Sequence, residues 1–297
     1  MSGGIRRAVI VGGQGAVGRL FTEKLQGSGV QICVVDPAGA GAPAPGGARS
    51  IHGDITDLSP RLEKELGKAD VVVLAVPEPV ALAAVKGVAA ALRPGALLVD
   101  TLSVKQRIDE EFRAHVDGDA VEALGLNPMF APALGFEGRV VAASVTYGGP
   151  LTAELLRLVE SWGGRVVRVE AAEHDRLTAV SQALTHATVL SFGLALSRMG
   201  TDVEEVAKIA PPPHKTLASL LARVSSGTPE VYWDVQAANP QAVSARTALA
   251  EAARRLADTV KDGTEEDFTA LMAKVRGALG AELDNYRELC ARIFANV

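Results

Sequence analysis

Residues 8–36 read AVIVGGQGAVGRLFTEKLQGSGVQICVVD and decide the fold of this chain. An apolar run typical of a strand, 8–11, leads into a glycine-rich turn at 12–18. Apolar residues then recur at helical spacing, and a second apolar strand, 32–35, ends in Asp36. This order of strand, tight turn, helix and strand predicts the first unit of a doubly wound α/β domain.

The three spaced glycines have separate expected tasks. Gly13 permits the tight turn, Gly15 lets the backbone approach a pyrophosphate, and Gly18 lets helix and strand pack closely. The helix N-terminus offers unpaired N–H groups to the phosphates. Asp36 would accept hydrogen bonds from both ribose hydroxyls and repel a 2′-phosphate, which favours NAD over NADP. A glycine loop of no special use is the alternative, but strand, spacing, helix and acidic residue all agree with a dinucleotide. The residues expected to contact NAD are Gly13, Gln14, Gly15, Ala16, Val17, Gly18, Asp36, Val76, Pro77 and Ser103.

Composition excludes several classes of partner. The 297 residues are 48% hydrophobic and 22% charged, which is typical of a globular chain long enough for two cores. A net charge of -5 without a run of Lys or Arg argues against a nucleic-acid or anionic membrane partner. Cys33 and Cys290 lie far apart, and no Cys, His or carboxylate group has the spacing of a metal site. We therefore expect no metal.

The chain is also expected to be cytoplasmic. Its early apolar segment is about one strand long and runs straight into the glycine turn, unlike a signal peptide. Residues 177–196 form the one stretch that resembles a membrane span, but Gln182, Thr185 and His186 interrupt it. This stretch is expected to be the buried central helix of a helical domain.

Two domains are predicted from the order of the elements. Strands and helices alternate up to about residue 171, with a Pro- and Gly-rich loop at 37–47 and buried strands such as 71–76. Only helical patterns follow. The prediction is a Rossmann-type NAD-binding domain at 1–171 and an all-helical substrate and dimerisation domain at 172–297. Long helices with wide apolar faces favour a homodimer over the alternative of a monomeric helical cap.

Four motifs resemble the prephenate dehydrogenase family. They are VGGQGAVGRLF at 11–21, VDTLSVK at 99–105, GLNPMFAP at 125–132 and EHDRLTAVSQALTH at 173–186. Members of that family oxidatively decarboxylate prephenate or arogenate on the way to tyrosine. The resemblance implies that a substrate ring lies between the nicotinamide and the start of the helical domain, with hydride leaving the ring carbon that bears the hydroxyl.

Asn127 departs from the family pattern. The resemblance implies a histidine before Pro-Met-Phe, where it accepts the proton of the ring hydroxyl, and an amide cannot replace it as a base. Losing a positioned base typically costs about 10² to 10⁴ in rate. Asn127 is either a turn residue, the mark of an inactive enzyme, or an acceptor for a substrate that carries an amine in place of the hydroxyl. The third interpretation is preferred and points to 4-amino-4-deoxyprephenate, oxidised to 4-aminophenylpyruvate, an antibiotic precursor in relatives of the family.

Other site residues follow from the resemblance. Ser103 is expected to bridge nicotinamide and substrate, or to cap a helix that begins at Val104; with Asn127 it forms the predicted catalytic pair. The family offers an arginine after an Asn between the later helices, but here Asn239 precedes Pro240. Replacement cations are Lys105, Lys215, His214 or Arg246, and the sequence leaves this choice open. The expected substrate contacts are Ser103, Lys105, Asn127, Met129, Gln182, His186, His214 and Lys215.

Some residues keep a structural alternative. His186 is as well explained as a hydrogen-bonded core residue of an apolar helix, and His174 with Asp175 is expected to be structural at the domain junction. Two further functions compete with amine oxidation: an ordinary prephenate or arogenate dehydrogenase that has compensated for the missing histidine, and a catalytically inactive NAD-binding regulator.

Overall fold

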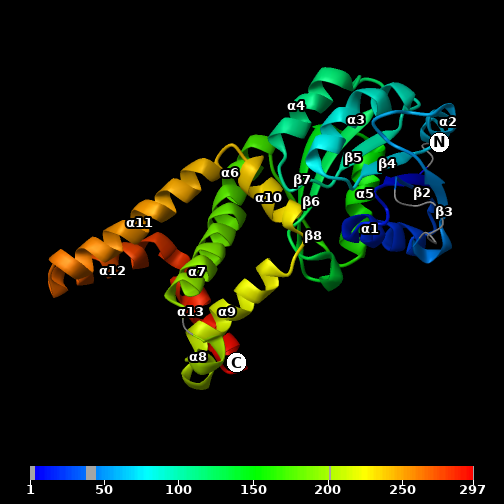
Figure 1. The fold of residues 1–297 in the computed structure, drawn as a ribbon. Helices are drawn as coiled ribbons and strands as arrows, with labels where there is room; N and C mark the ends of the chain where they lie inside the picture. Colours follow the sequence, from blue (N-terminus) through cyan, green and yellow to red (C-terminus); the bar gives the residue numbers. More distant parts are fainter. Residues whose placement is uncertain (1–3, 38–44, 201, 297) are drawn as a thin grey trace. The chain divides into compact units, whose positions relative to one another are not determined.

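The chain divides into two compact units, Met1–Leu177 and Thr178–Val297. The computed structural model describes residues 4–37, 45–200 and 202–296 (Figure 1). The boundary expected between residues 171 and 172 falls at the start of α6 (Ala171–Thr178), slightly ahead of this division. Most of the predicted loop at 37–47 lies outside the described residues.

A single sheet forms the centre of the first unit. Its strand order is β3-β2-β1-β4-β5-β6-β7-β8, and every neighbouring pair is parallel except β6 with β7. The predicted Rossmann-type fold is therefore confirmed, with one antiparallel pair towards the far edge. The strands are β1 (Arg7–Val11), β2 (Gln31–Asp36), β3 (Arg49–His52), β4 (Val71–Leu74), β5 (Leu97–Asp100), β6 (Glu122–Pro128), β7 (Val140–Tyr147) and β8 (Arg165–Arg168).

Helices cover both faces of the sheet, as Figure 1 shows. One apolar core packs α2 (Pro60–Leu66), α3 (Glu78–Ala91) and α4 (Gln106–His115) on one face. The other core packs α1 (Ala16–Gly27) and α5 (Pro150–Ser161) on the opposite face. All four residues of β4 are fully buried, as expected for a central strand between two helical layers.

The ends of two strands, β4 and β6, affect the site, and the predicted end of the first is wrong. The strand predicted to reach Val76 ends at Leu74, and Val76 instead packs beside Gly12. The strand β6 runs through Asn127, which pairs with Ala142 of β7. Asn127 is therefore a strand residue whose backbone direction is set by the sheet, and its interpretation as a turn residue is wrong.

The glycine turn between β1 and α1 is packed without room for side chains. Gly12 has φ +78° and provides the left-handed turn that had been expected of Gly13. A Cβ on Gly13 would lie 2.5 Å from the Val34 side chain. A Cβ on Gly18 would lie 2.3 Å from the Gly12 carbonyl oxygen, so the close approach of the helix at Gly18 is to the turn that follows β1.

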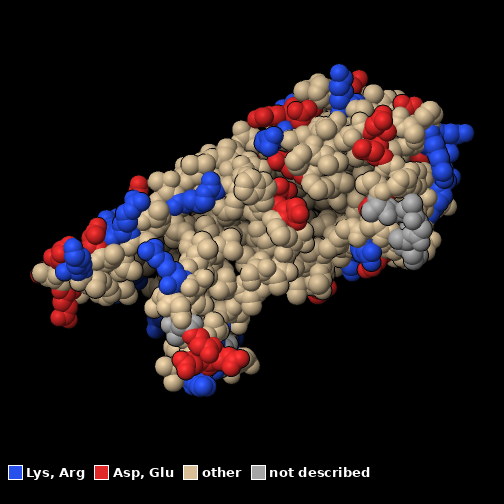
Figure 2. Space-filling model, in the orientation of Figure 1, with Lys and Arg blue, Asp and Glu red and all other residues tan. Residues whose placement is uncertain are grey.

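The second unit is helical in the part that the structure describes. The helical run that enters it from α6 contains a π-helical turn, η3 (Ala179–Leu184), and continues as α7 (Thr185–Met199). The following helices are α8 (Val203–Ile209), α9 (Pro212–Ser225), α10 (Pro229–Ala237), α11 (Ala242–Asp262), α12 (Glu265–Leu279) and α13 (Leu283–Phe294). On the face drawn in Figure 2, the charged side chains of the long helices lie in small separate groups, with wide uncharged areas between them.

The expected burial of residues 177–196 is wrong for the single chain. Val180 and Leu194 are 59% and 74% exposed, because η3 and α7 pack chiefly on α9, α10 and α11 and leave a side uncovered. By length and composition, the run Ala171–Met199 is also the one described helix apolar enough to cross a membrane. The apolar side of this run is therefore surface in one copy of the chain.

Gly18→Ala tests the packing of the glycine turn. The added methyl group would overlap backbone atoms that cannot move independently, so we expect the free energy of unfolding to fall by about 1–3 kcal/mol. Urea denaturation measures this change.

Gly27→Ala is the matched control, because Gly27 ends the same helix and an added Cβ meets nothing within 4 Å. We expect it to stay within about 1 kcal/mol of the wild type. Equal stability of the two variants would contradict the close contact between α1 and the turn.

Candidate active site

The glycine turn leaves the N-terminus of α1 open. Gly15 is the N-cap residue, no side chain caps the first turn, and no acidic residue lies in it. A Cβ on Gly15 would have one neighbour within 4 Å, the Gly12 carbonyl oxygen at 3.2 Å. The first N–H groups of α1 are therefore accessible to a ligand phosphate, because neither a cap nor a side chain covers them.

Asp36 provides the second half of a dinucleotide site. It lies at the carboxyl end of β2, and its Oδ2 accepts a hydrogen bond of 3.1 Å from the backbone N–H of Gln14. A carboxylate next to the glycine turn suits a ribose with free hydroxyl groups. The residues present thus fit a dinucleotide without a 2′-phosphate.

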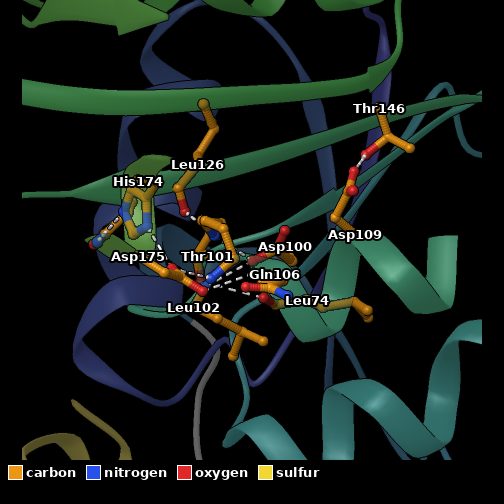
Figure 3. Close-up of polar contacts among 12 residues, drawn as sticks. Leu74, Asp100, Thr101, Leu102, Gln106, Asp109, Leu126, Thr146, His174 and Asp175 are labelled. Carbon is orange, nitrogen blue, oxygen red and sulfur yellow. Dashed lines mark hydrogen bonds and ion pairs between the residues drawn. The ribbon is translucent and has the colours of Figure 1, made fainter. Parts of the chain in front are cut away.

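A buried polar network follows the ends of β5 and β6 (Figure 3). Its members are at most 3% exposed and come from four segments of the first unit. They are Asp100, Lys105, Asn127, His174 and Asp175.

Lys105 and Asp100 form an ion pair at the base of this network. The Lys105 ammonium contacts the Asp100 carboxylate and donates to the carbonyl oxygen of Leu126 at 2.9 Å. Burial raises the pKa of Asp100 and lowers the pKa of Lys105, and their mutual attraction opposes both shifts. The substrate contact expected of Lys105 is therefore corrected to a structural role, because its ammonium is buried and already engaged.

Asp175 holds the N-terminus of α4. Its two carboxylate oxygens accept the backbone N–H groups of Lys105 and Gln106 at 2.8 and 2.9 Å. The helix begins at Gln106, so Ser103 is not its N-cap, and the capping alternative for Ser103 is wrong. Ser103 lies in the bend before the helix and is partly exposed, which leaves its hydroxyl available for the predicted contact with ligand.

His174 connects Asp175 to Asn127. Its Nδ1 lies 2.8 Å from Asp175 Oδ1, and its Nε2 lies 3.1 Å from Asn127 Nδ2. A carboxylate only accepts, so Nδ1 carries the proton and the neutral ring accepts at Nε2. The Asn127 amide therefore donates to His174, and its Oδ1 keeps its acceptor capacity, since Asn127 makes no other side-chain hydrogen bond within the described residues.

The link between His174 and Asn127 was missed by sequence reasoning, which treated His174 and Asp175 as structural only. Adjacent His and Asp residues indicate an oriented imidazole in many sites. The sequence offered no signal for its partner, because 47 residues separate Asn127 from His174 and the sheet brings them together.

The helical unit contains the remaining predicted substrate contacts except Met129, which lies in the first unit. His186 packs edge-on against Tyr232 with ring centroids 4.9 Å apart, and its Nδ1 is buried without a hydrogen-bond partner among the described residues. Burial, and then the charge of Arg223, lower the pKa of His186. His214 packs on Phe192, while Lys215 is exposed on α9. Met129 follows β6, and Gln182 lies in the π-helical turn; both are partly exposed.

Together, the Rossmann sheet, the open helix N-terminus and Asp36 define a dinucleotide-binding protein with a helical C-terminal unit. Residues 51–149 match the family model described as prephenate dehydrogenase, nucleotide-binding domain, and residues 170–274 match prephenate dehydrogenase, dimerization domain. The chain belongs to the prephenate dehydrogenase family. The first matched range begins at residue 51, so the glycine turn is assigned from its geometry.

Individual relatives agree with this family. The chain is 52% identical over 288 residues to 4-amino-4-deoxyprephenate dehydrogenase of Streptomyces pristinaespiralis, covering 97% of this chain and 96% of the relative. Its fold is similar to that of prephenate dehydrogenase from Aquifex aeolicus, with a TM-score of 0.70, 20% identity and coverage of 91% and 97% of the two chains. It is also similar to Synechocystis arogenate dehydrogenase, with a TM-score of 0.66, 18% identity and coverage of 94% and 99%.

Lys105→Met tests the buried ion pair. Removal of the ammonium leaves the Asp100 charge uncompensated, so we expect a loss of about 3–5 kcal/mol in the free energy of unfolding, measured by urea denaturation. Adding Asp100→Asn removes that charge and is expected to restore part of the loss.

Lys64→Met is the control, because Lys64 is exposed on α2 and the same substitution there is expected to change stability by about 0.5 kcal/mol or less. A Lys105→Met variant as stable as this control would contradict the structural role of Lys105.

Proposed function

We propose that this chain catalyses the NAD-dependent oxidative decarboxylation of 4-amino-4-deoxyprephenate to 4-aminophenylpyruvate. The observation that carries the proposal is Asn127, an amide held by His174 at the position where the family resemblance implies a histidine base. The name of the Streptomyces relative supports the same substrate. The reaction would supply antibiotic-precursor biosynthesis in the cytoplasm.

NAD is the proposed cofactor. The uncapped N-terminus of α1 would hold the pyrophosphate, and Asp36 would accept the ribose hydroxyls. Val76 lies beside Gly12 of the same turn, and Pro77 follows it as the N-cap residue of α3. When bound, NAD+ supplies the acceptor for the hydride.

A substrate amine in its neutral form makes a general base unnecessary. As hydride leaves the ring carbon that bears nitrogen, the nitrogen lone pair stabilises the developing positive charge. The electrons of the bond to the ring carboxylate then enter the ring, carbon dioxide leaves, and an aromatic amine remains. Written for the neutral amine, whose lone pair the step requires, this balance consumes one NAD+ and releases one NADH and one carbon dioxide with no proton gained or lost; a substrate that arrives as the ammonium ion first releases one proton to water.

Asn127 would position the amine during this step. Its Oδ1 can accept an N–H from the substrate because His174 engages the amide nitrogen. Ser103 would lie beside the reacting ring, as the family resemblance implies. A ring hydroxyl also donates to an amide oxygen, but the amide cannot take its proton, so the charge that develops on oxygen is not relieved.

Steady-state assays with three substrates test this function. We expect kcat/KM for the amino compound to exceed that for prephenate and arogenate by about 10² to 10⁴, because only the amine reacts without a base. NADH formation at 340 nm measures all three. Faster turnover of prephenate or arogenate would favour the tyrosine-pathway alternative, and no turnover of any of them would favour an NAD-binding regulator.

Asn127→His extends the same assay. A histidine here restores a base beside the ring hydroxyl, so kcat/KM for prephenate is expected to rise about tenfold or more. Asn127→Gln keeps the amide chemistry and serves as the control, with no gain expected. A folded Asn127→His variant without gain on prephenate would show that residue 127 does not face the ring substituent.

We also infer a homodimer through the helical unit. The matched dimerization-domain model covers residues 170–274, and α12 carries an apolar stripe one helical face wide. Its members, all more than 40% exposed, are Phe268, Met272, Val275 and Leu279. A second copy would cover this stripe and the exposed side of residues 171–199. No membrane would then be needed to bury these apolar side chains.

Val275→Glu tests the dimer. A charge in the stripe would be desolvated on association, so we expect the mass measured by light scattering to fall from twice the 30.8 kDa chain mass towards one chain. Lys274→Glu is the control at the neighbouring exposed position and should remain dimeric. A monomeric wild type, or wild type that sediments with membranes, would contradict the proposal.

A further inference from the structure

The first residues of β1, β2 and β3 carry polar side chains on the face of the sheet that α2 covers. Side chains of a strand alternate between the two faces, so residues two apart share a face. The core under α2 includes Val9, Cys33 and Ile51. Arg7, Gln31 and Arg49, each two residues earlier in its strand, therefore lie on this face as well.

A cavity of about 330 Å³, the amino-end cavity, opens between these strand starts and the end of α2. The polar residues of its lining are Arg7, Gln31, Cys33, Arg49, Glu65 and Lys68. Buried Val9 and Ala69 form an apolar part of the wall. Asp36 lies at the other end of β2 from Gln31, about 16 Å away at about 3.3 Å per residue, so this cavity is separate from the glycine turn.

Cations outnumber carboxylates in the lining of the amino-end cavity. Glu65 is the one carboxylate, against Arg7, Arg49 and Lys68. Arg49 Nη2 lies 2.5 Å from Glu65 Oε2, and Lys68 Nζ lies 3.9 Å from the same oxygen. The lining therefore has a net charge of +2, in a chain whose net charge is -5. Figure 2 shows Lys and Arg side chains gathered over the edge that carries α2 and β3 in Figure 1.

Neighbouring groups leave this positive charge in place. The Asp70 carboxylate accepts the backbone N–H of Arg7 and pairs with Arg93, so it is already engaged. Burial, and then the charge of Glu65, raise the pKa of the Cys33 thiol, which is therefore neutral at pH 7. An anion that entered the cavity would thus meet a surplus of positive charge.

We propose that the amino-end cavity binds a phosphate monoester of a small organic molecule. A phosphate monoester carries a charge of about -1.5 to -2 at pH 7, which matches the lining, whereas a carboxylate carries one charge. The planar N–H groups of Arg7 and Arg49 suit phosphate oxygens. The cavity exceeds the size of a phosphate group alone, so the organic part would contact the apolar wall of Val9 and Ala69.

Titration calorimetry on the full chain saturated with NAD+ tests the proposal, because the N-terminus of α1 is then occupied by the cofactor. The probes are ribose 5-phosphate, ribonate and ribose, which share a sugar skeleton and differ in charge. We expect ribose 5-phosphate to bind about tenfold or more tightly than ribonate, since its doubly charged group can engage both arginines. Ribose is expected to give no measurable binding.

Arg49→Met and Arg7→Met test the two arginines separately. Each removes hydrogen bonds to a charged group, so the dissociation constant of ribose 5-phosphate should rise about tenfold or more. Arg165→Met is the matched control, because Arg165 begins the edge strand β8 as Arg49 begins the edge strand β3, and it is exposed. The dissociation constant of NAD+ should change less than about twofold in all three variants, since its site is distant.

Glu65→Gln tests the charge of the lining in the opposite direction. Removal of the one carboxylate should tighten ribose 5-phosphate binding about two- to fivefold, the range expected for an exposed charge pair. Damage to the fold would not produce such a gain. Glu63→Gln, exposed on the same helix and outside the lining, is the control and should leave binding unchanged. Weaker binding by Glu65→Gln than by Glu63→Gln would contradict the proposal.

The proposal is overturned if ribose 5-phosphate binds no more tightly than ribonate or ribose. It is also overturned if neither Arg49→Met nor Arg7→Met weakens binding relative to Arg165→Met. Displacement of NAD+ by ribose 5-phosphate would overturn it as well, because the anion would then occupy the glycine turn. No probe is a substrate of the proposed reaction, so failure of the proposed function leaves this test intact.

Discussion

The Asp175 carboxylate accepts the first backbone N–H groups of α4 and the Nδ1 proton of His174. Through these three hydrogen bonds it fixes where the helix after β5 begins and which tautomer the imidazole adopts. The imidazole in turn fixes the Asn127 amide, and the Oδ1 of that amide is the acceptor used in the proposed reaction. Helix start, tautomer and amide orientation therefore depend on one buried side chain.

The ion pair of Lys105 and Asp100 stabilises the same region. Lys105 spans from the Asp100 carboxylate to the carbonyl oxygen of Leu126, the residue before Asn127. The backbone at Gly125 leaves no space for a side chain, because a Cβ there would lie 2.9 Å from both Asp100 Oδ2 and Lys105 Cδ. A buried pair of this kind contributes little net stability compared with apolar residues, but losing one partner is costly. Its role here is to hold the ends of β5 and β6.

The helical unit differs from the first unit because it leaves much of its apolar surface exposed. Within the described chain, its long helices cover only part of their apolar surface, and Val180, Leu194 and the α12 stripe remain exposed. Only a partner outside the chain could bury that area. The polar cluster of Arg246, Gln236 and His186 is, in contrast, held by contacts inside the unit, so its geometry does not require a second copy.

Local sequence alone determined the glycine turn, the alternation of strands and helices up to residue 171, and the helical remainder, because glycine conformation and hydrophobic periodicity act over a few residues. The family resemblance, and not local sequence, identified Asn127 as the unusual residue. Only the tertiary structure decided that Lys105 is an internal counter-ion, that Ser103 does not cap α4, and that Asp175 caps it from 70 residues away. These roles depend on which strand ends meet, and charges and N–H groups distant in sequence find their partners only when the sheet is assembled. The same reason applies to Arg246, whose hydrogen bonds to Gln236 on α10 are visible only in the fold.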